Sequence, residues 1–135
     1  MPLLAQDALV AATASLPGSA VTVTSSLIDT GNVDGDNMPG RVQYKLTAPI
    51  LTATQLGSGS SVTYTIYTSP NSDASSAVAK YVVPTVQTGT SSGDLTGFTF
   101  HFALPTTAKQ YIYFTAAGAG GVAASASSAS LVALF

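Results

Sequence analysis

The sequence contains very little charge. Its 135 residues include six Asp, three Lys, one Arg and no Glu, so 7% are charged, against about 25% in a typical soluble domain. The net charge is −2 and the sequence pI is about 4.7. Nucleic acids and anionic lipids bind basic surfaces, which this composition does not supply. We therefore expect neither nucleic acid nor a membrane as a partner.

Cysteine is also absent, which excludes disulfides, thiolate nucleophiles and cysteine-based metal sites. Residues 1–7 lack a basic segment, and Asp7 interrupts the apolar run, so we expect no secretory signal. No stretch approaches the run of about 20 apolar residues that crosses a membrane.

Catalytic and metal-binding patterns are weak. His101 is the only histidine, and its place on the polar side of a Phe-rich strand favours an exposed or interfacial residue. No Gly-x-Ser-x-Gly elbow follows a strand and precedes a helix. Residues 34–37 (Asp-Gly-Asp-Asn) resemble the start of a calcium loop, but the chain has no Glu for the twelfth position of such a loop. We expect no enzyme, no cofactor and no metal.

The main pattern in the sequence is an alternation of polar and apolar residues, with a period of two. Polar and apolar residues alternate in residues 41–47, 61–68 and 97–104, and the apolar positions are rich in Tyr, Phe, Val and Ile. Such alternation is typical of half-buried strands. Turn-forming clusters separate the runs. We predict one all-β domain over residues 1–135, a β-sandwich or jelly roll of about 7–8 strands, with an extended N-terminal arm at residues 1–15.

Further strands are expected from β-forming residues without clean alternation. Residues 20–24 lead into a run at 27–30, and residues 81–83 and 111–115 are apolar on both sides. The last two runs fit either central strands or a contact surface. Residues 122–135 are Ala-rich, which permits a helix, but the Ser pairs and the apolar ending favour a final strand.

The scarcity of charge itself favours a protein that works inside an assembly. Few ionic groups would lose water when a partner docks, so the surface is easily desolvated. We predict that Leu3 and Leu4 in the arm, together with Leu134 and Phe135 at the end, contact another chain. Tyr67 is predicted as a contact because it is an aromatic residue on the polar side of its strand, with Thr63 and Thr65.

Several stretches bring a family to mind. They are residues 27–31, residues 62–69 with the following turn at 73–75, Leu104-Pro105 leading into residues 109–114, and the ending 131–134. In this order, over about residues 25–135, the chain resembles the capsid cement (decoration) proteins of tailed bacteriophages. It departs from them in lacking an Arg in residues 111–114.

The resemblance implies a β-sandwich or jelly-roll protein that binds the outer capsid and stabilises contacts between capsomers. Its partners would be the major capsid protein and copies of itself, as a homotrimer or, second, a dimer. It would be located on the virion, on the capsid exterior, after assembly in the host cytoplasm. Two alternatives remain: another virion module (head fibre, tail or baseplate) and a carbohydrate- or receptor-binding β-sandwich.

Overall fold

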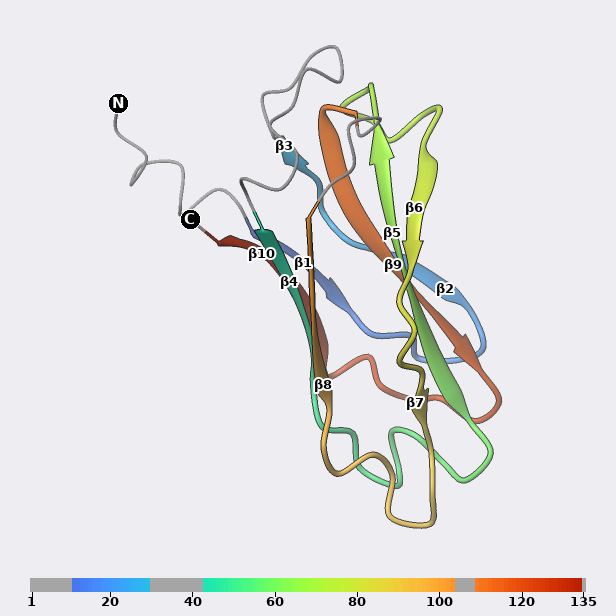
Figure 1. The fold of residues 1–135 in the computed structure, drawn as a ribbon. Coiled ribbons are helices and arrows are strands. Elements are labelled where there is room, and N and C mark those ends of the chain that lie inside the picture. Colours follow the sequence, from blue (N-terminus) through green and yellow to red (C-terminus); the bar gives the residue numbers. More distant parts are fainter. Residues whose placement is uncertain (1–10, 30–42, 104–108, 135) are drawn as a thin grey trace.

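The computed structural model describes residues 11–29, 43–103 and 109–134, and these residues form strands, turns and loops without a helix (Figure 1). The strands are β1 (Ala11–Ser15), β2 (Thr22–Thr24), β3 (Ile28–Asp29), β4 (Gln43–Ala48), β5 (Ser61–Ser69), β6 (Val78–Val82), β7 (Gln87–Thr88), β8 (Phe98–Ala103), β9 (Tyr111–Ala119) and β10 (Ser128–Leu134).

Two antiparallel sheets pack face to face. Sheet A has the strand order β1-β10-β4-β8, and sheet B has the order β2-β9-β5-β6, with β3 pairing with β9 and β7 pairing with β5. The short strands β2 and β3 share one edge of sheet B, and β6 and β7 share the other. The ten strands thus fill eight positions, in the order of a two-sheet jelly roll. The predicted all-β sandwich is confirmed, and the predicted strand number corresponds to these eight positions.

Alternation along each strand builds the core. In β5, Val62, Tyr64 and Ile66 are fully buried, whereas the residues between them are partly exposed. The central strand β9 contributes Ile112 and Phe114 from the same side of sheet B. From sheet A the buried side chains include Ala12, Ala14, Tyr44, Leu46, Phe102, Ala129 and Leu131. Burial of these apolar side chains between the sheets supplies the main stabilising term of the fold.

Each edge of sheet B is divided into two short strands at a specific residue. Between β2 and β3, Ser25 donates its backbone N–H to the Phe114 carbonyl (2.9 Å) and accepts the Phe114 N–H with its side-chain Oγ (3.0 Å). A side chain therefore takes the place of a backbone partner, and the strand is interrupted. Between β6 and β7 stands Pro84, which has no N–H to donate to a ladder.

The N-terminal segment differs from the prediction. Residues 11–15 were expected in an extended arm, but they form β1, which pairs along its length with β10. The prediction of an arm is therefore wrong for these residues, and residues 1–10 lie outside the described part. The reason is the burial of two small side chains, Ala12 and Ala14, which alternate with exposed residues. The predicted final strand at the other end of the chain is confirmed as β10.

One buried polar cluster connects the two sheets at one end of the sandwich. Gln87 is 1% exposed. Its Oε1 accepts a hydrogen bond from Tyr64 Oη (2.5 Å), and its Nε2 donates to the Pro49 carbonyl (2.7 Å) and to Asp94 Oδ2 (2.9 Å). Burial and the Asp94 charge together raise the pKa of Tyr64. Burial would raise the pKa of Asp94, but hydrogen bonds from Gln87, Thr96 and Gly97 outweigh it and lower that pKa.

Candidate interaction surfaces

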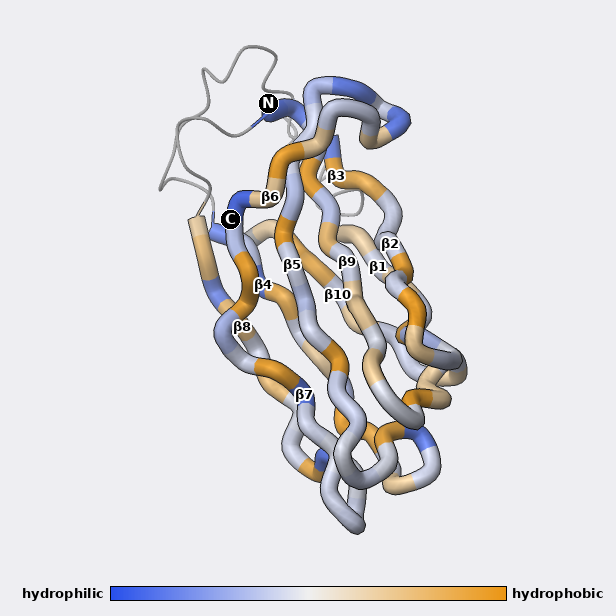
Figure 2. Tube along the Cα trace, turned by 90° about the vertical axis from the view of Figure 1, so that its right-hand side faces the viewer, coloured by the Kyte–Doolittle hydropathy of each residue, from blue (hydrophilic) through white to orange (hydrophobic). Residues whose placement is uncertain are grey.

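The outward side of sheet B presents hydroxyl and small apolar groups. Because β5 and β9 bury alternate residues, the others project away from the core. Figure 2 looks onto this sheet, where β5 and β9 alternate between orange and pale positions. We call this surface the threonine face; it consists of Thr22, Thr24, Thr63, Thr65, Tyr67, Val82, Thr115 and Ala117.

Strand register arranges these residues in rows across the sheet. One row runs from Thr24 to Thr115, Thr65 and Val82, and each is the register partner of the next. Neighbouring strands lie about 4.8 Å apart, so the hydroxyl and methyl groups of such a row form an even surface. Val82, at the end of the row, is 67% exposed. The pattern of the sequence gives the alternation, but the rows depend on register.

Tyr67, predicted as a contact residue, lies on the threonine face. Its ring stacks on that of its register partner Tyr113, with centroids 5.3 Å apart and planes 8° from parallel. Tyr67 is half-buried, whereas Tyr113 is only 6% exposed although it is on the outward side. Burial, with a smaller effect of Tyr67, raises the pKa of Tyr113. The stacked pair therefore lies on the outward side of sheet B, with Tyr67 as its accessible member.

The strands of sheet B contain very little charge. Strands β2, β5, β7 and β9 contain no charged residue. The charged residues of the other two strands of sheet B are Asp29 in β3 and Lys80, which lies at the register shift of β6. A partner that covers the threonine face would remove water from hydroxyl and apolar groups and from few ions.

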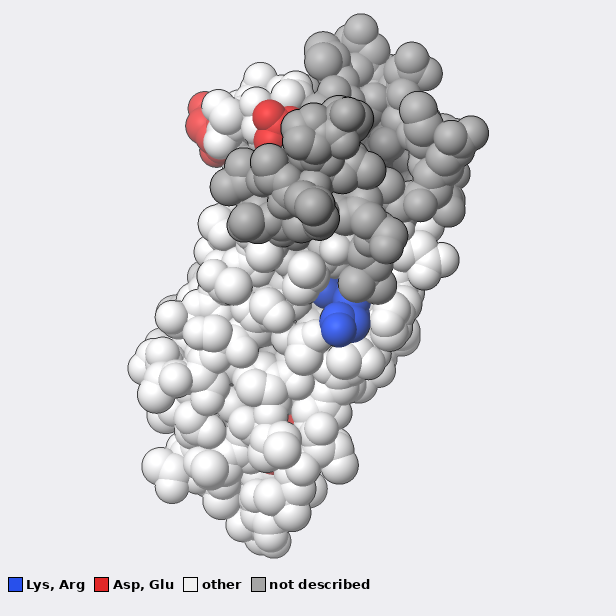
Figure 3. All heavy atoms as spheres, turned by 90° about the vertical axis from the view of Figure 1, so that its left-hand side faces the viewer, with Lys and Arg blue, Asp and Glu red and all other residues white. Residues whose placement is uncertain are grey.

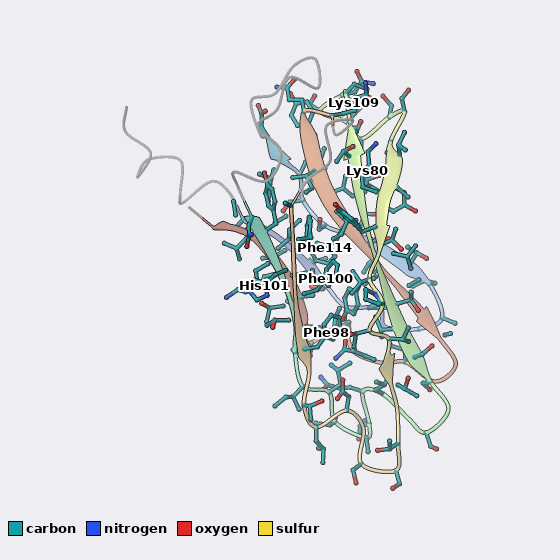
Figure 4. The ribbon with its side chains drawn as sticks, viewed as in Figure 1. Lys80, Phe98, Phe100, His101, Lys109 and Phe114 are labelled. Carbon is teal, nitrogen blue, oxygen red and sulfur yellow. The ribbon has the colours of Figure 1, made fainter. Side chains whose placement is uncertain are left out.

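The outward side of sheet A is similar but carries a cation. Figure 3 shows this side, on which uncharged atoms predominate. The register of β4 and β8 places Lys45 beside His101, and Thr47 beside Thr99. His101 is exposed and points away from the sandwich, whereas Phe98 and Phe100 point into it (Figure 4).

Among the described residues, the surroundings of His101 do not form a catalytic triad. Its strand neighbours on this side are Lys45, Thr99 and Ala103, none of which has a carboxylate to orient an imidazole. A Gly-x-Ser-x-Gly sequence does occur at residues 89–93, but Thr90 and Gly93 close it into a tight turn that leads to another loop. It is therefore not a strand-to-helix elbow.

The expectation that no metal is bound can be compared with the described residues only. Within the described ranges, no three His, Cys, Asp or Glu side chains form a group that could hold a metal ion. The calcium-like residues 34–37 lie outside those ranges. Asp73, which lies in the β5–β6 turn, instead accepts the Ser75 N–H with Oδ1 (2.9 Å), and hydrogen bonds from Ser75 lower its pKa.

The remaining predicted contact residues are only partly placed. Leu3, Leu4 and Phe135 lie outside the described residues. Leu134 ends β10, where its backbone pairs with Gln43, and its side chain is not described. The described residues therefore do not test whether these four residues lie near Tyr67.

An apolar pair that the sequence reading did not single out lies at one end of the sandwich. Leu51 and Asp94 pair through two backbone hydrogen bonds of 2.9 and 2.8 Å, which places Ile50 opposite Leu95. Ile50 and Leu95 are 57% and 65% exposed. Neither residue belongs to an alternating run, so strand periodicity contained no signal for the pair.

Among the described residues there is no helix long and apolar enough to span a membrane. A comparison of the sequence with models of known protein families finds no match, and a comparison with curated proteins finds none either.

Proposed function

We propose that this chain is a non-enzymatic capsid cement protein of a tailed bacteriophage, which binds the outer shell and stabilises contacts between capsomers of the major capsid protein. In this role it is located on the capsid exterior and is added in the host cytoplasm. It acts as a homo-oligomer, for which the resemblance implies a trimer first and a dimer second. The observation that carries the proposal is the nearly uncharged threonine face.

The composition of the threonine face suits permanent contact with protein. A threonine hydroxyl can exchange its water for a hydrogen bond to a partner, and its methyl group gains from burial. Removing water from an ion costs far more unless a counter-charge is placed beside it. Thr65 and Thr115, directly paired at the centre of the sheet, therefore offer a partner both hydrogen bonds and apolar contact at a low desolvation cost.

The size of the threonine face is also adequate. Strands β5 and β9 have 9 residues each, and sheet B is four strands wide along its hydrogen-bonded path. With about 3.3 Å per residue and about 4.8 Å between strands, the outward side of sheet B, which contains the threonine face, measures at most about 30 by 19 Å, or about 570 Å². A standard interface buries about 800 Å² on each partner. The outward side of sheet B is thus large enough for most of one stable contact with the shell.

A lysine at the centre of this face tests the proposal. Thr65→Lys would place an unpaired ammonium group in the contact, while its outward position leaves the core unchanged. The matched control is Thr13→Lys, an exposed threonine on β1 of the other sheet. Binding is measured by co-sedimentation with capsid shells that are purified without this protein from the phage that encodes it. We expect loss of binding for Thr65→Lys and wild-type binding for Thr13→Lys.

Two results would contradict the proposal. One is a folded Thr65→Lys protein that binds shells as tightly as the wild type. The other is a wild-type protein that binds no shell, or that is located by electron microscopy on a head fibre, tail or baseplate, which would favour another virion module.

Tyr67 supports a second candidate, a carbohydrate- or receptor-binding module. Its half-buried ring lies among threonine hydroxyls, an arrangement that can contact a sugar. It ranks second because one side of the ring is occupied by Tyr113. A glycan array would test it: a hit that Tyr67→Ala abolishes, together with absence of shell binding, would favour this candidate over the cement protein.

A further inference from the structure

The described strands form four sheet edges, and three of them are protected against pairing with another chain. On β1, the Thr13 N–H donates to Ser26 Oγ and the Thr13 carbonyl accepts the Ser26 N–H, both at 3.3 Å. The edge made by β2 and β3 consists of pieces of three and two residues. The edge made by β6 and β7 has a register shift, a lysine at that shift, and Pro84 between the strands. Such features hinder edge-to-edge association.

The fourth edge, β8, lacks these features. Phe98–Ala103 is the longest of the edge strands, pairs with β4 in unbroken register, and contains no proline, lysine or bulge. Among the described residues it pairs with β4 alone. At its end, the Ala103 carbonyl accepts a hydrogen bond from the side-chain Oη of Tyr81 (2.6 Å). Residues 98–102 thus present a regular edge with donors and acceptors.

The inward side chains of β8 are also incompletely covered. Phe98 and Phe100 point into the sandwich but are only half-buried, whereas Phe114 on the central strand β9 is fully buried (Figure 4). Both rings already pack on aromatic neighbours of sheet B, Phe98 on Tyr64 and Phe100 on Tyr81. The remaining exposure is expected of an edge strand, and another strand beside β8 would reduce it.

We propose that β8 pairs with β8 of a second copy of this chain. Antiparallel pairing would join the two copies of sheet A into one continuous sheet of eight strands. A second copy is the occupant that fits, because an antiparallel pair of identical strands offers each side the same donors, acceptors and phenyl groups. The β8 pair would be the contact through which the proposed cement protein forms oligomers. The pairing itself does not depend on the cement function; only its biological role rests on that proposed function.

Charge does not oppose this pairing. Lys45 is the charged residue of β4, one strand in from the edge. In the joined sheet the two Lys45 strands are three spacings apart, about 14 Å, which exceeds the screening length of about 8 Å at physiological salt. The outward side chains on β8 itself are Thr99, His101 and Ala103, of which Thr99 and Ala103 are uncharged.

The proposal also concerns symmetry. Antiparallel pairing of one strand with its own copy has a two-fold axis, so it closes after two chains. It therefore favours a dimer over the trimer expected first from the resemblance.

The experiment measures the mass of the full chain by light scattering at several concentrations. We expect about twice the 13.5 kDa of one chain. In the double variant Thr99→Lys/His101→Lys, lysines of the two copies would face each other about 5 Å apart across the new pair. We expect this variant to be folded and monomeric at concentrations where the wild type is a dimer. The control Thr13→Lys adds a lysine on β1, at the opposite edge of sheet A, and should remain a dimer.

Hydrogen exchange on the wild-type chain repeats the test without a substitution. If β8 pairs with its copy, exchange of amides within residues 98–102 slows as the protein concentration rises, while exchange in β6 does not change. A monomer at all concentrations, a trimer, a folded double variant that stays dimeric, or β8 exchange independent of concentration would overturn the proposal. A dimer without shell binding would instead count against the cement function, and a monomer that binds shells would count against the β8 contact alone.

Discussion

Replacing Gln87 by methionine tests the polar cluster that joins the sheets. The substitution keeps the length of the side chain but removes three hydrogen bonds, to Tyr64, Pro49 and Asp94. A buried hydroxyl left without a partner costs about 1–3 kcal/mol. Loss of the hydrogen bond to the Pro49 carbonyl adds a similar or smaller cost. Loss of the hydrogen bond to Asp94 adds the least, because this carboxylate keeps its hydrogen bonds from Thr96. We expect the free energy of unfolding to fall by about 3 kcal/mol.

A double-mutant cycle separates this cause from general loss of packing. In Tyr64→Phe/Gln87→Met the unpaired hydroxyl is gone, so the double variant should cost at least about 1 kcal/mol less than the sum of the single variants. Urea unfolding at neutral pH, followed by tyrosine fluorescence, measures all four proteins. Gln43→Met, on an exposed position of β4, is the control and should change stability by less than about 0.5 kcal/mol. Additive costs, or a loss below about 1 kcal/mol for Gln87→Met, would refute the reasoning.

Three further predictions concern pH and close packing. The pKa of Asp94 is lowered in the fold. The contribution of this carboxylate to stability is therefore present above its unfolded pKa of about 3.9 and is lost as the pH falls through the lower folded pKa. On acidification, the urea midpoint of Asp94→Asn should accordingly fall less than that of the wild type. Burial raises the pKa of Tyr44 to about 12. The contribution of this neutral phenol to stability is therefore present below its unfolded pKa of about 10 and is lost as the pH rises through 12. Absorbance titration should show Tyr44 ionising only well above pH 10, and its ionisation near pH 10 in the folded protein would contradict its burial. A Cβ at Gly89 would lie 2.0 Å from the Gly57 carbonyl oxygen, so Gly89→Ala should lower the free energy of unfolding by about 3 kcal/mol or more; Gly18→Ala, where the nearest atom is 3.5 Å away, should change it little in the same urea assay.

Alternation in the sequence predicted β4, β5 and β8 and much of the core. Residues 61–68 and 97–104 lie in or overlap β5 and β8, and the inward positions expected within those strands are confirmed for Val62, Tyr64, Ile66, Phe98, Phe100 and Phe102. The run at 111–115, apolar on both sides, is explained by the central position of β9 and by the stacked Tyr113 on its outward side. The run at 81–83, read the same way, instead overlaps an edge strand, β6.

Strand β1 was missed although its signal is present. Thr13 and Ser15 alternate with Ala12, Ala14 and Leu16, but alanine is too small and too common in helices and loops for this alternation to be distinctive. The buried cluster around Gln87 was missed for another reason. A glutamine between Val86 and Thr88 reads as a surface residue, and only the approach of Tyr64 and Asp94, distant in the sequence, gives it partners.

The sequence by itself determined the class of fold and the scarcity of charge, because both depend on composition and on a local period of two. Only the tertiary structure decided which strands lie side by side, since antiparallel pairing joins segments as distant as β1 and β10. Register then placed Thr24, Thr115 and Thr65 in one row. The order of strands left β8 at an edge. Both candidate contacts, the threonine face and the β8 edge, therefore arise from long-range pairing, which local sequence patterns do not encode.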